Sequence, residues 1–312
     1  MNRVKDGATR AGPRLFGGRR LSQWTVSQIW GYLFILPFMV LFVLFNAWPS
    51  VYSLWLSVVK FKPLSVSPFV GLGNYARVVH NPVFWIAMWN TLRYVLMVVP
   101  AGVAISLVMA ILIYSLRSDV MRQFYQSAFL LPGAVSGLAV AIVWRYMFDN
   151  EMGLLNYALS LLGLGRVNWL GQLNTALPSL VFMALLGGGG GTIVIFVAGL
   201  GGIPTELYDA AMIDGANMLR KHFTITLPLL MPSILYVVVM GTLGAFQVFT
   251  PMFVMTGGGP LNRTMTVCYL LYRQLTSYGD IGAASAMGLL LVLACLGLTV
   301  AQFRWFSNVV EY

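Results

Sequence analysis

Residues 202–232 read GIPTELYDAAMIDGANMLRKHFTITLPLLMP, the longest polar interval between apolar segments in the second half of the chain. Three of the nine acidic residues lie in it: Glu206, Asp209 and Asp214. Pro204 and Thr205 are typical first residues of a helix, and the helix dipole favours acidic side chains near that end. The stretch therefore predicts a short helix over residues 206–213 with acidic groups in its first turns.

One face of this predicted helix is narrow and mostly small. Residues spaced i, i+3, i+4 and i+7 share that face: Leu207, Ala210, Ala211 and Asp214. Such a face suits insertion into a groove of a partner protein. Gly215 then predicts a turn, and a second short helix is expected to end before Pro228 and Pro232.

The overall composition is that of a membrane protein. Of the 312 residues, 59% are hydrophobic and 9% are charged, whereas about a quarter are charged in a soluble domain. The net charge of +10 does not indicate nucleic acid, because six of the nineteen basic residues lie in the first twenty positions and the rest are scattered between apolar segments. We expect no cleavable signal peptide, since no short apolar segment with a cleavage site follows the basic start. Cys268 and Cys295 have no metal-binding spacing.

Six stretches are long and apolar enough to cross a bilayer as helices, which takes about 20 residues. They cover residues 30–56, 86–116, 124–147, 176–200, 229–254 and 281–303. We therefore predict an all-α membrane protein with six transmembrane helices in a domain over residues 29–306. Residues 1–28 are expected to form a basic tail that ends in an interfacial helix at 21–28, and residues 307–312 a short C-terminal tail.

Six spans place both termini on one side of the membrane. The basic N-terminal tail predicts that this side is the cytoplasm. The loop 202–228 between the fourth and fifth spans then also faces the cytoplasm. Connections 57–85, 148–175 and 255–280 face the outside.

The same loop resembles the cytoplasmic motif of bacterial ABC importer permeases, which is Glu-Ala-Ala, three residues, Gly, nine residues, then Ile-x-Leu-Pro. The matching positions are Asp209, Ala210, Ala211, Gly215, Ile225, Leu227 and Pro228. Asp209 stands where Glu is usual, which keeps the charge with one methylene less reach. The resemblance implies the type I ABC importer permease fold in the plasma (inner) membrane, with a cytoplasmic coupling helix in this loop.

Four further segments resemble the carbohydrate branch of that family. They are VGLGNYARVV (70–79), NWLGQLNTALPSL (168–180), TGGGPLNRT (256–264) and GDIGAASAMGLLL (279–291). Together with the loop motif, the resemblance covers about residues 30–305. It implies a subunit similar to the first permease of carbohydrate or glycerol-phosphate importers.

The resemblance also implies partners: a second homologous permease, a dimer of ABC ATPase subunits, an extracytoplasmic solute-binding protein and membrane lipid. The residues that would couple this chain to the ATPase are Glu206, Asp209, Ala210, Ala211, Asp214 and Gly215. ATP and Mg would bind the partner ATPase, because this chain has no Gly-x-x-x-x-Gly-Lys-Ser/Thr loop. We predict neither an enzyme nor a cofactor or metal site in this chain; His80 and His222 have no obvious ligand companions.

Five consecutive glycines, 187–191, lie inside the fourth apolar span. Glycine lets backbones or substrates approach closely and weakens a helix locally. In related importers the substrate passes between the two permeases near this depth, so we predict a hollow that borders the path of an oligosaccharide. Close helix packing is the alternative. The predicted path residues are Gly133, Gly137, Gly187, Gly188, Gly191, Gly241, Gly244 and Gln247.

Other functions stay open on the sequence. An ion-coupled secondary transporter would need acidic groups inside the spans, whereas Asp149 and Asp280 fall at their outer ends. Within the family, a neutral oligosaccharide is the first prediction and glycerol 3-phosphate or an acidic oligosaccharide the second. The second is favoured by arginines in the outer connections: Arg145, Arg166, Arg263 and Arg273. Arg93, near the outer end of the second span, is expected to snorkel.

Overall fold

A computed structural model describes residues 23–61 and 67–307 of the chain. The described residues are almost entirely helical, and their β structure is one isolated bridge between Val59 and Phe69. The predicted all-α fold is thereby confirmed. The chain divides into two units, one up to Trp55 and one from Leu56 onward.

The first unit holds the first apolar span. It contains α1 (Gln23–Phe42), a π-helical turn (Val43–Ala47) and most of α2 (Trp48–Ser57). The helix Trp30–Ser57 is long and apolar enough to cross a membrane, as predicted for residues 30–56. The expected interfacial helix at 21–28 is not separate, because α1 begins at Gln23 and continues into the span. The rest of the predicted tail, residues 1–22, lies outside the described residues.

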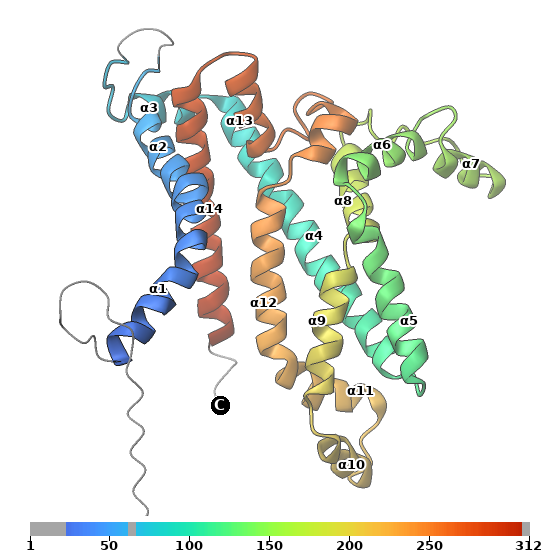
Figure 1. Cartoon of the computed structure of the whole chain (residues 1–312). Helices are drawn as coiled ribbons and strands as arrows, with labels where there is room; N and C mark the ends of the chain where they lie inside the picture. The colour runs from blue at the N-terminus through green and yellow to red at the C-terminus, as the bar shows by residue number, and fades with distance from the viewer. Residues whose placement is uncertain (1–22, 62–66, 308–312) are drawn as a thin grey trace, which may run out of the picture. The chain divides into compact units, whose positions relative to one another are not determined.

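The second unit is a helical bundle with α4 at its centre (Figure 1). α4 packs against both α9 and α12, and α14 packs against α3, α12 and α13. The α-helices of this unit are α3 (Gly73–Val79), α4 (Pro82–Tyr114), α5 (Asp119–Leu130), α6 (Gly137–Met147), α7 (Leu154–Leu161), α8 (Ala176–Gly187), α9 (Gly190–Gly201), α10 (Thr205–Ile213), α11 (Met218–Lys221), α12 (Leu227–Phe246), α13 (Val267–Thr276) and α14 (Ile281–Ser307). Asn81 caps α4 by accepting a hydrogen bond from the Val83 amide at 2.9 Å.

Four helices in the described residues are long and apolar enough to cross a membrane, and two bent helix pairs raise the number to six if each pair is one span. The bent pairs are Asp119–Ala134 with Gly137–Met147, at 90°, and Ala176–Gly187 with Gly190–Gly201, at 51°. The predicted number of spans fits this arrangement. Residues 124–147 do not form the single uninterrupted helix expected, because Pro132 in the 3₁₀ turn Leu131–Ala134 lacks an amide donor and α5 ends before it.

The fifth span differs from its prediction at both ends. α11, a π-helical turn (His222–Thr226) and α12 form one helix, Met218–Phe246, which runs through Pro228 and Pro232. The prediction that a short helix ends before these prolines is wrong. The wider π turn lies directly before Pro228, and helices in a membrane bundle tolerate prolines of this kind. The helix ends at Phe246, before the predicted residue 254, and a separate π-helical turn follows at Met252–Thr256.

The second unit has two contrasting ends (Figure 1). α10 and α11 lie at one end, called here the α10 end, and α14 finishes on the same side. α3, α13 and the start of α14 lie at the opposite end, called the α3 end. Two buried clusters lie between them: one joins α4 to α8, α13 and α14, and the other joins α4 to α9 and α12.

Candidate functional site

α10 forms where the acidic loop predicted a helix. It spans Thr205–Ile213 with Pro204 at its N-cap, and none of its residues is buried. Its apolar side chains are also open, since Ile213 is 89% exposed and Met212 60%. A helix that buries none of its own residues gains little from packing within the chain, so its surface is available to a partner.

Gly215 ends α10 through its backbone conformation. Its φ is +74°, in the left-handed region that favours glycine. The Gly215 amide donates to Met212 O at 3.1 Å, and the Ala216 amide to Ala211 O at 2.9 Å. These two bonds are the paired C-terminal bonds of a Schellman motif. A Cβ added at Gly215 would meet no atom within 4 Å, so backbone strain, not crowding, explains the motif glycine.

The three predicted coupling acids have no cation partner among the described residues. The ion pairs formed within residues 23–61 and 67–307 are Arg77–Asp280 and Arg122–Asp119. The acids in question, all exposed, are Glu206, Asp209 and Asp214. Ala210 lies beside Asp209 on the open surface and Ala211 is half-buried. α10 and its C-cap therefore present acidic side chains that form no ion pair within the described residues, next to small alanine side chains.

One side chain of α10 ties it to the long helix that follows. The Tyr208 hydroxyl lies 2.9 Å from the hydroxyl of Thr226, which is completely buried at the start of α12. His222 Nδ1 lies 3.1 Å from the same Thr226 oxygen. Tyr208 was not among the coupling residues predicted from the sequence. The sequence signal for it is that Tyr208 directly precedes Asp209 and points to a different side of the helix from the small face.

The glycine run breaks the fourth apolar span into α8 and α9. Gly188 and Gly189 separate the two helices, whose axes differ by 51°. The predicted local weakening is thus present as a bend. Beside it lies a cavity of about 470 Å³ between α4, the α8–α9 break and α12.

Three predicted path residues line this cavity: Gly188, Gly191 and Gly241. Gly102, Gly189 and Thr192 also line it, together with the hydroxyl-bearing Ser106 and Tyr236. No charged side chain does so. Apolar walls with a few hydroxyl groups suit a polar but uncharged ligand surface. Tyr236 and Ser106 were missed, because one hydroxyl in an apolar helix gives no spacing signal.

The other predicted path residues lie outside this cavity. They are Gly133, Gly137, Gly187, Gly244 and Gln247. Gly133 and Gly137 flank the 90° bend between α5 and α6. Gln247 is the exposed C-cap of α12, one turn beyond Gly244. These five residues lie on helices next to the cavity and do not line it, so the predicted path residues do not form one continuous wall.

Adjacent glycines in the run differ in the space around them. A Cβ added at Gly190 would lie 2.0 Å from Phe129 O on α5, so that position has no room for any side chain. A Cβ at Gly191 would meet no atom within 4 Å. Close helix packing therefore explains Gly190, and Gly191 opens onto the cavity; the substrate path stays a prediction.

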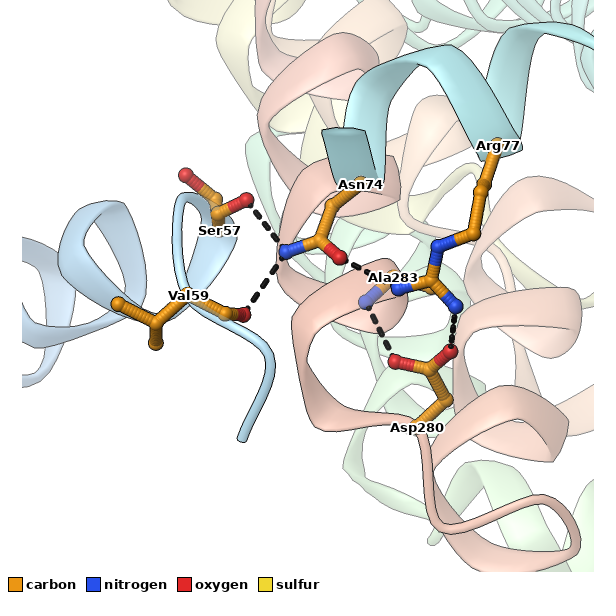
Figure 2. Close-up of polar contacts among 6 residues, drawn as sticks. All are labelled: Ser57, Val59, Asn74, Arg77, Asp280 and Ala283. Carbon is orange, nitrogen blue, oxygen red and sulfur yellow. Dashed lines mark hydrogen bonds and ion pairs between the residues drawn. The ribbon is translucent and has the colours of Figure 1, made fainter. Parts of the chain in front are cut away.

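At the α3 end, two of the resembling segments meet in one polar cluster (Figure 2). The amide of Asn74, a completely buried residue, donates to Ser57 O at 2.7 Å and Val59 O at 2.9 Å. Arg77 donates to the Asn74 side-chain oxygen and, at 2.6 Å, to Asp280. We call Asn74, Arg77 and Asp280 the polar lock.

The polar lock also explains two neighbouring residues. Asp280 caps α14 by accepting from the Ala283 amide at 3.0 Å (Figure 2). A Cβ added at Gly282 would lie 2.7 Å from both the Asn74 amide and Val59 O. Gly282 is thus required by the close approach of Asn74. The segments 70–79 and 279–291, which both resemble the family, therefore fold against each other.

Asp149 and Asp280, the two acids predicted at the outer ends of the spans, serve the fold. The amides of Met152 and Glu151 donate to Asp149, each at 2.9 Å, and these bonds lower the pKa of Asp149. Asp280 belongs to the polar lock. Among residues 23–61 and 67–307, no group of three His, Cys, Asp or Glu residues could hold a metal ion.

Comparison with known families identifies the class of protein. Residues 102–308, more than half of the chain, match the family described as "Binding-protein-dependent transport system inner membrane component". The chain belongs to this family. It is a permease subunit of an importer that depends on a binding protein, and the ion-coupled alternative is set aside.

Curated relatives cover nearly the whole chain. The permease protein AraP of an arabinooligosaccharide transport system in Bacillus subtilis (strain 168) is 34% identical over 275 residues, covering 88% of this chain and 87% of AraP. The sn-glycerol-3-phosphate transport system permease protein UgpA of Yersinia pestis bv. Antiqua (strain Antiqua) is 33% identical over 288 residues, covering 90% and 95%. The chain is similar to both to nearly the same degree.

Solved structures of a similar fold come from a bacterial ABC transporter involved in the import of the acidic polysaccharide alginate. One matches with a TM-score of 0.79 at 21% identity, over 92% of this chain and 98% of that one. A second, in complex with an alginate pentasaccharide-bound periplasmic protein, matches with a TM-score of 0.80. This likeness establishes the ABC importer permease fold.

Proposed function

We propose that this chain conducts a sugar, first of all an oligosaccharide, through an ATP-driven importer, and that α10 is its coupling helix. The observation that carries the proposal is α10 itself: an exposed acidic helix, closed by a Schellman turn, whose acids have no cation partner in the described chain. Asp209 pairs with a basic residue in a cleft of the ATPase. ATP and Mg bind that ATPase subunit.

The orientation follows from the same assignment. The α10 end faces the cytoplasm, where ATP is available, and the α3 end faces the solute-binding protein. The C-terminal end of α14 lies at the α10 end, which supports cytoplasmic termini for a chain of six spans. The basic first twenty residues agree with this orientation. The domain limits at residues 29, 202–228 and 306 belong to this proposal.

The connection from α10 to α12 transmits the motion. Closure of the ATPase dimer moves α10, and the Tyr208–Thr226 hydrogen bond carries the displacement to the start of α12. α12 lines the cavity at Gly241, so its movement changes that wall directly. The break between α8 and α9 gives the opposite wall a place to bend. Rocking of these helices exchanges inward for outward access.

The cavity beside the glycine break is this chain's half of the sugar path. Its volume of about 470 Å³ lies in the range of small-molecule sites, and hydroxyl groups at Ser106, Thr192 and Tyr236 provide partners for sugar hydroxyls. The names of the relatives support a sugar or a sugar-like polyol phosphate as cargo. The second permease closes the path from the other side.

Energy dependence tests the function. The chain is reconstituted in vesicles with its partner permease, ATPase and binding protein, and uptake of labelled sugar is measured with ATP or with an imposed proton or sodium gradient. Uptake with ATP alone supports the proposal. Uptake driven by a gradient, or by this chain without its partners, would contradict it.

A matched pair of substitutions tests the path. Gly191→Trp places a large ring in the open cavity and should stop oligosaccharide uptake while the ATPase still associates. Gly187→Trp is the control, because a Cβ there also meets no atom within 4 Å but Gly187 does not line the cavity. Unchanged uptake of a large sugar by Gly191→Trp would remove the cavity from the path.

A further inference from the structure

A second cavity lies at the α3 end and contains two arginines. Its volume is about 340 Å³, and its polar lining consists of Arg93 on α4, Arg263 in the segment 256–264 and Asn174 in the segment 168–180. Apolar side chains, among them Met97 and Leu177, complete it. Arg93 was expected to snorkel, and Arg263 was one of the four arginines predicted in the outer connections. The fold brings them to one site.

Hydrogen bonds hold the Arg263 segment against α4. The Asn90 amide donates to Asn262 O at 2.7 Å and to Met265 O at 3.0 Å, on either side of Arg263. Asn90 and Thr91 are buried on α4, one turn from Arg93, and Thr91 Oγ1 accepts from the Val267 amide at 3.1 Å. These bonds fix the segment on the helix that carries the second arginine.

The segment is also internally rigid. Thr264 is completely buried and donates to Gly259 O at 2.7 Å, and its hydroxyl lies 2.7 Å from that of Thr256. Leu261 has a φ of 46°, a left-handed conformation that leucine adopts only when its surroundings impose it, and Asn262, a residue type that tolerates this region, has a φ of 61°. Such imposed backbone geometry is concentrated at ligand sites. The segment therefore positions Arg263 in advance.

The charge of the cavity is uncompensated within the described chain. Two guanidinium groups line this cavity, so two positive charges face one space. Neither arginine takes part in the ion pairs of residues 23–61 and 67–307, and no acidic side chain lines the cavity. Arg93 lies over the Trp89 ring, 5.2 Å from its centroid, which leaves guanidinium hydrogens for a ligand. Guanidinium groups bind carboxylate and phosphate oxygens in a bidentate manner.

The arginine cavity and the glycine cavity are two separate cavities, and the same two helices, α4 and α8, line both. On α4, Met97 lines the first and Val98 the second; on α8, Leu177 lines the first and Ala184 the second. Seven helical residues correspond to roughly 10 Å. One oligosaccharide can therefore touch both cavities in succession.

We infer that the arginine cavity binds the carboxylate or phosphate group of an anionic sugar or polyol phosphate as it enters the path. This inference rests on the proposed function and selects an anionic cargo over a neutral one. Arg93 and Arg263 donate hydrogen bonds to the anionic oxygens, and the Asn174 amide faces the sugar hydroxyls. The uncharged glycine cavity then lets the same substrate pass inward without a second anchor.

Uptake of three labelled probes tests the inference in the complete importer with its binding protein, in vesicles of phosphatidylcholine. The probes are an alginate trisaccharide, glycerol 3-phosphate and a neutral arabinose trisaccharide. We expect import of an anionic probe, with half-saturation raised about tenfold in each of Arg93→Gln and Arg263→Gln. Arg263→Lys, which keeps the charge, should fall between. Arg166→Gln is the matched control, because it is an exposed arginine at the same end outside this cavity.

The alternatives give different results. Import of the neutral trisaccharide, unaffected by either glutamine substitution, would overturn the inference and leave sugar import intact. Loss of ATP-driven uptake of every probe in the unsubstituted protein would overturn the proposed function itself. If the substitutions matter only after phosphatidylglycerol is added, and then equally for all probes, the cavity holds a lipid phosphate and the inference is wrong.

Discussion

The two ends of the bundle treat their polar residues in opposite ways. At the α3 end, Asn74 is completely buried and hydrogen-bonded, and Asp280 both pairs with Arg77 and caps α14. At the α10 end, acids of similar chemistry are exposed and have no described cation partner. A buried polar group must find its hydrogen-bond partners within the fold. An exposed polar group is solvated by water and stays free to pair with another protein.

The difference indicates which end of the bundle is held by bonds within the chain and which end has polar groups left for a partner. The α3 end fixes the positions of α3, α4, α13 and α14 by internal bonds. α10 is held mainly by its turn and by one tyrosine. Substitutions at the α3 end should therefore lower stability, and substitutions on α10 should lower coupling without unfolding the protein.

Charge reversal on α10 should have the largest effect on transport. In Asp209→Lys, the acid that we propose to pair with the ATPase becomes a like charge, and ATPase association should weaken at least about a hundredfold. Thermal unfolding of the isolated chain in detergent should stay unchanged, because Asp209 is exposed and forms no ion pair within the described residues. Association is measured by co-purification and transport by uptake in vesicles.

Two controls accompany this substitution. Asp209→Glu restores the residue usual in the family motif and should retain transport. Glu151→Lys reverses an exposed acid at the opposite end and should leave ATPase association intact. Normal uptake by Asp209→Lys would count decisively against α10 as the coupling helix.

Crowding at the glycine break should have the next largest effect. Gly190→Ala places a Cβ 2.0 Å from Phe129 O and should reduce stability by about 1–3 kcal/mol, because backbone atoms must move. Gly191→Ala, one residue on, should be almost neutral. The comparison is made by thermal unfolding in detergent; equal melting temperatures would show that the two glycines are not distinguished by packing.

Removal of the polar lock should follow. Asn74→Ala leaves Ser57 O, Val59 O and the Arg77 guanidinium without the side chain that serves them, which costs about 1–3 kcal/mol. The exposed Asn150→Ala is the control. Hydrogen exchange should rise at the start of α14 in the first variant alone. Protection there that is unchanged would mean that Asp280 holds α14 without the lock.

The smallest effect is expected from the tie between α10 and α12. Tyr208→Phe removes one hydrogen bond, worth about 0.5–1.5 kcal/mol, and keeps the ring. ATP hydrolysis should continue while less sugar is imported per ATP. Tyr146→Phe, at an exposed tyrosine on α6, should not change that ratio. A lowered ratio in both variants would deny Tyr208 a specific role.

Much of the fold was predictable because a bilayer imposes simple rules on sequence. Apolar length predicted the all-α class and a number of spans that fits the described helices, and glycine after an acidic helix predicted the turn at Gly215. The bend at Pro132 and the continuous helix through Pro228 were not predicted correctly. A helix ends at a proline or continues through it according to the packing and the turn type around that proline. One sequence does not contain that information.

For the site, the sequence marked the coupling loop and the glycine run, but not their three-dimensional neighbours. Gly190 and Gly191 are equivalent in sequence, and only Phe129 on another helix distinguishes them. Tyr236 joins the cavity wall from α12, about 45 residues along the chain from the run.

The sequence by itself determined that this chain crosses a membrane and carries an acidic helix between its apolar spans, because hydropathy and local helix signals are properties of neighbouring residues. Only the tertiary structure decided that segments 70–79 and 279–291 form one polar lock, and that Arg93 and Arg263 face one cavity. Those groupings join residues about 170–200 positions apart. The packing of α4 against its neighbours brings them together, and no local pattern encodes that packing.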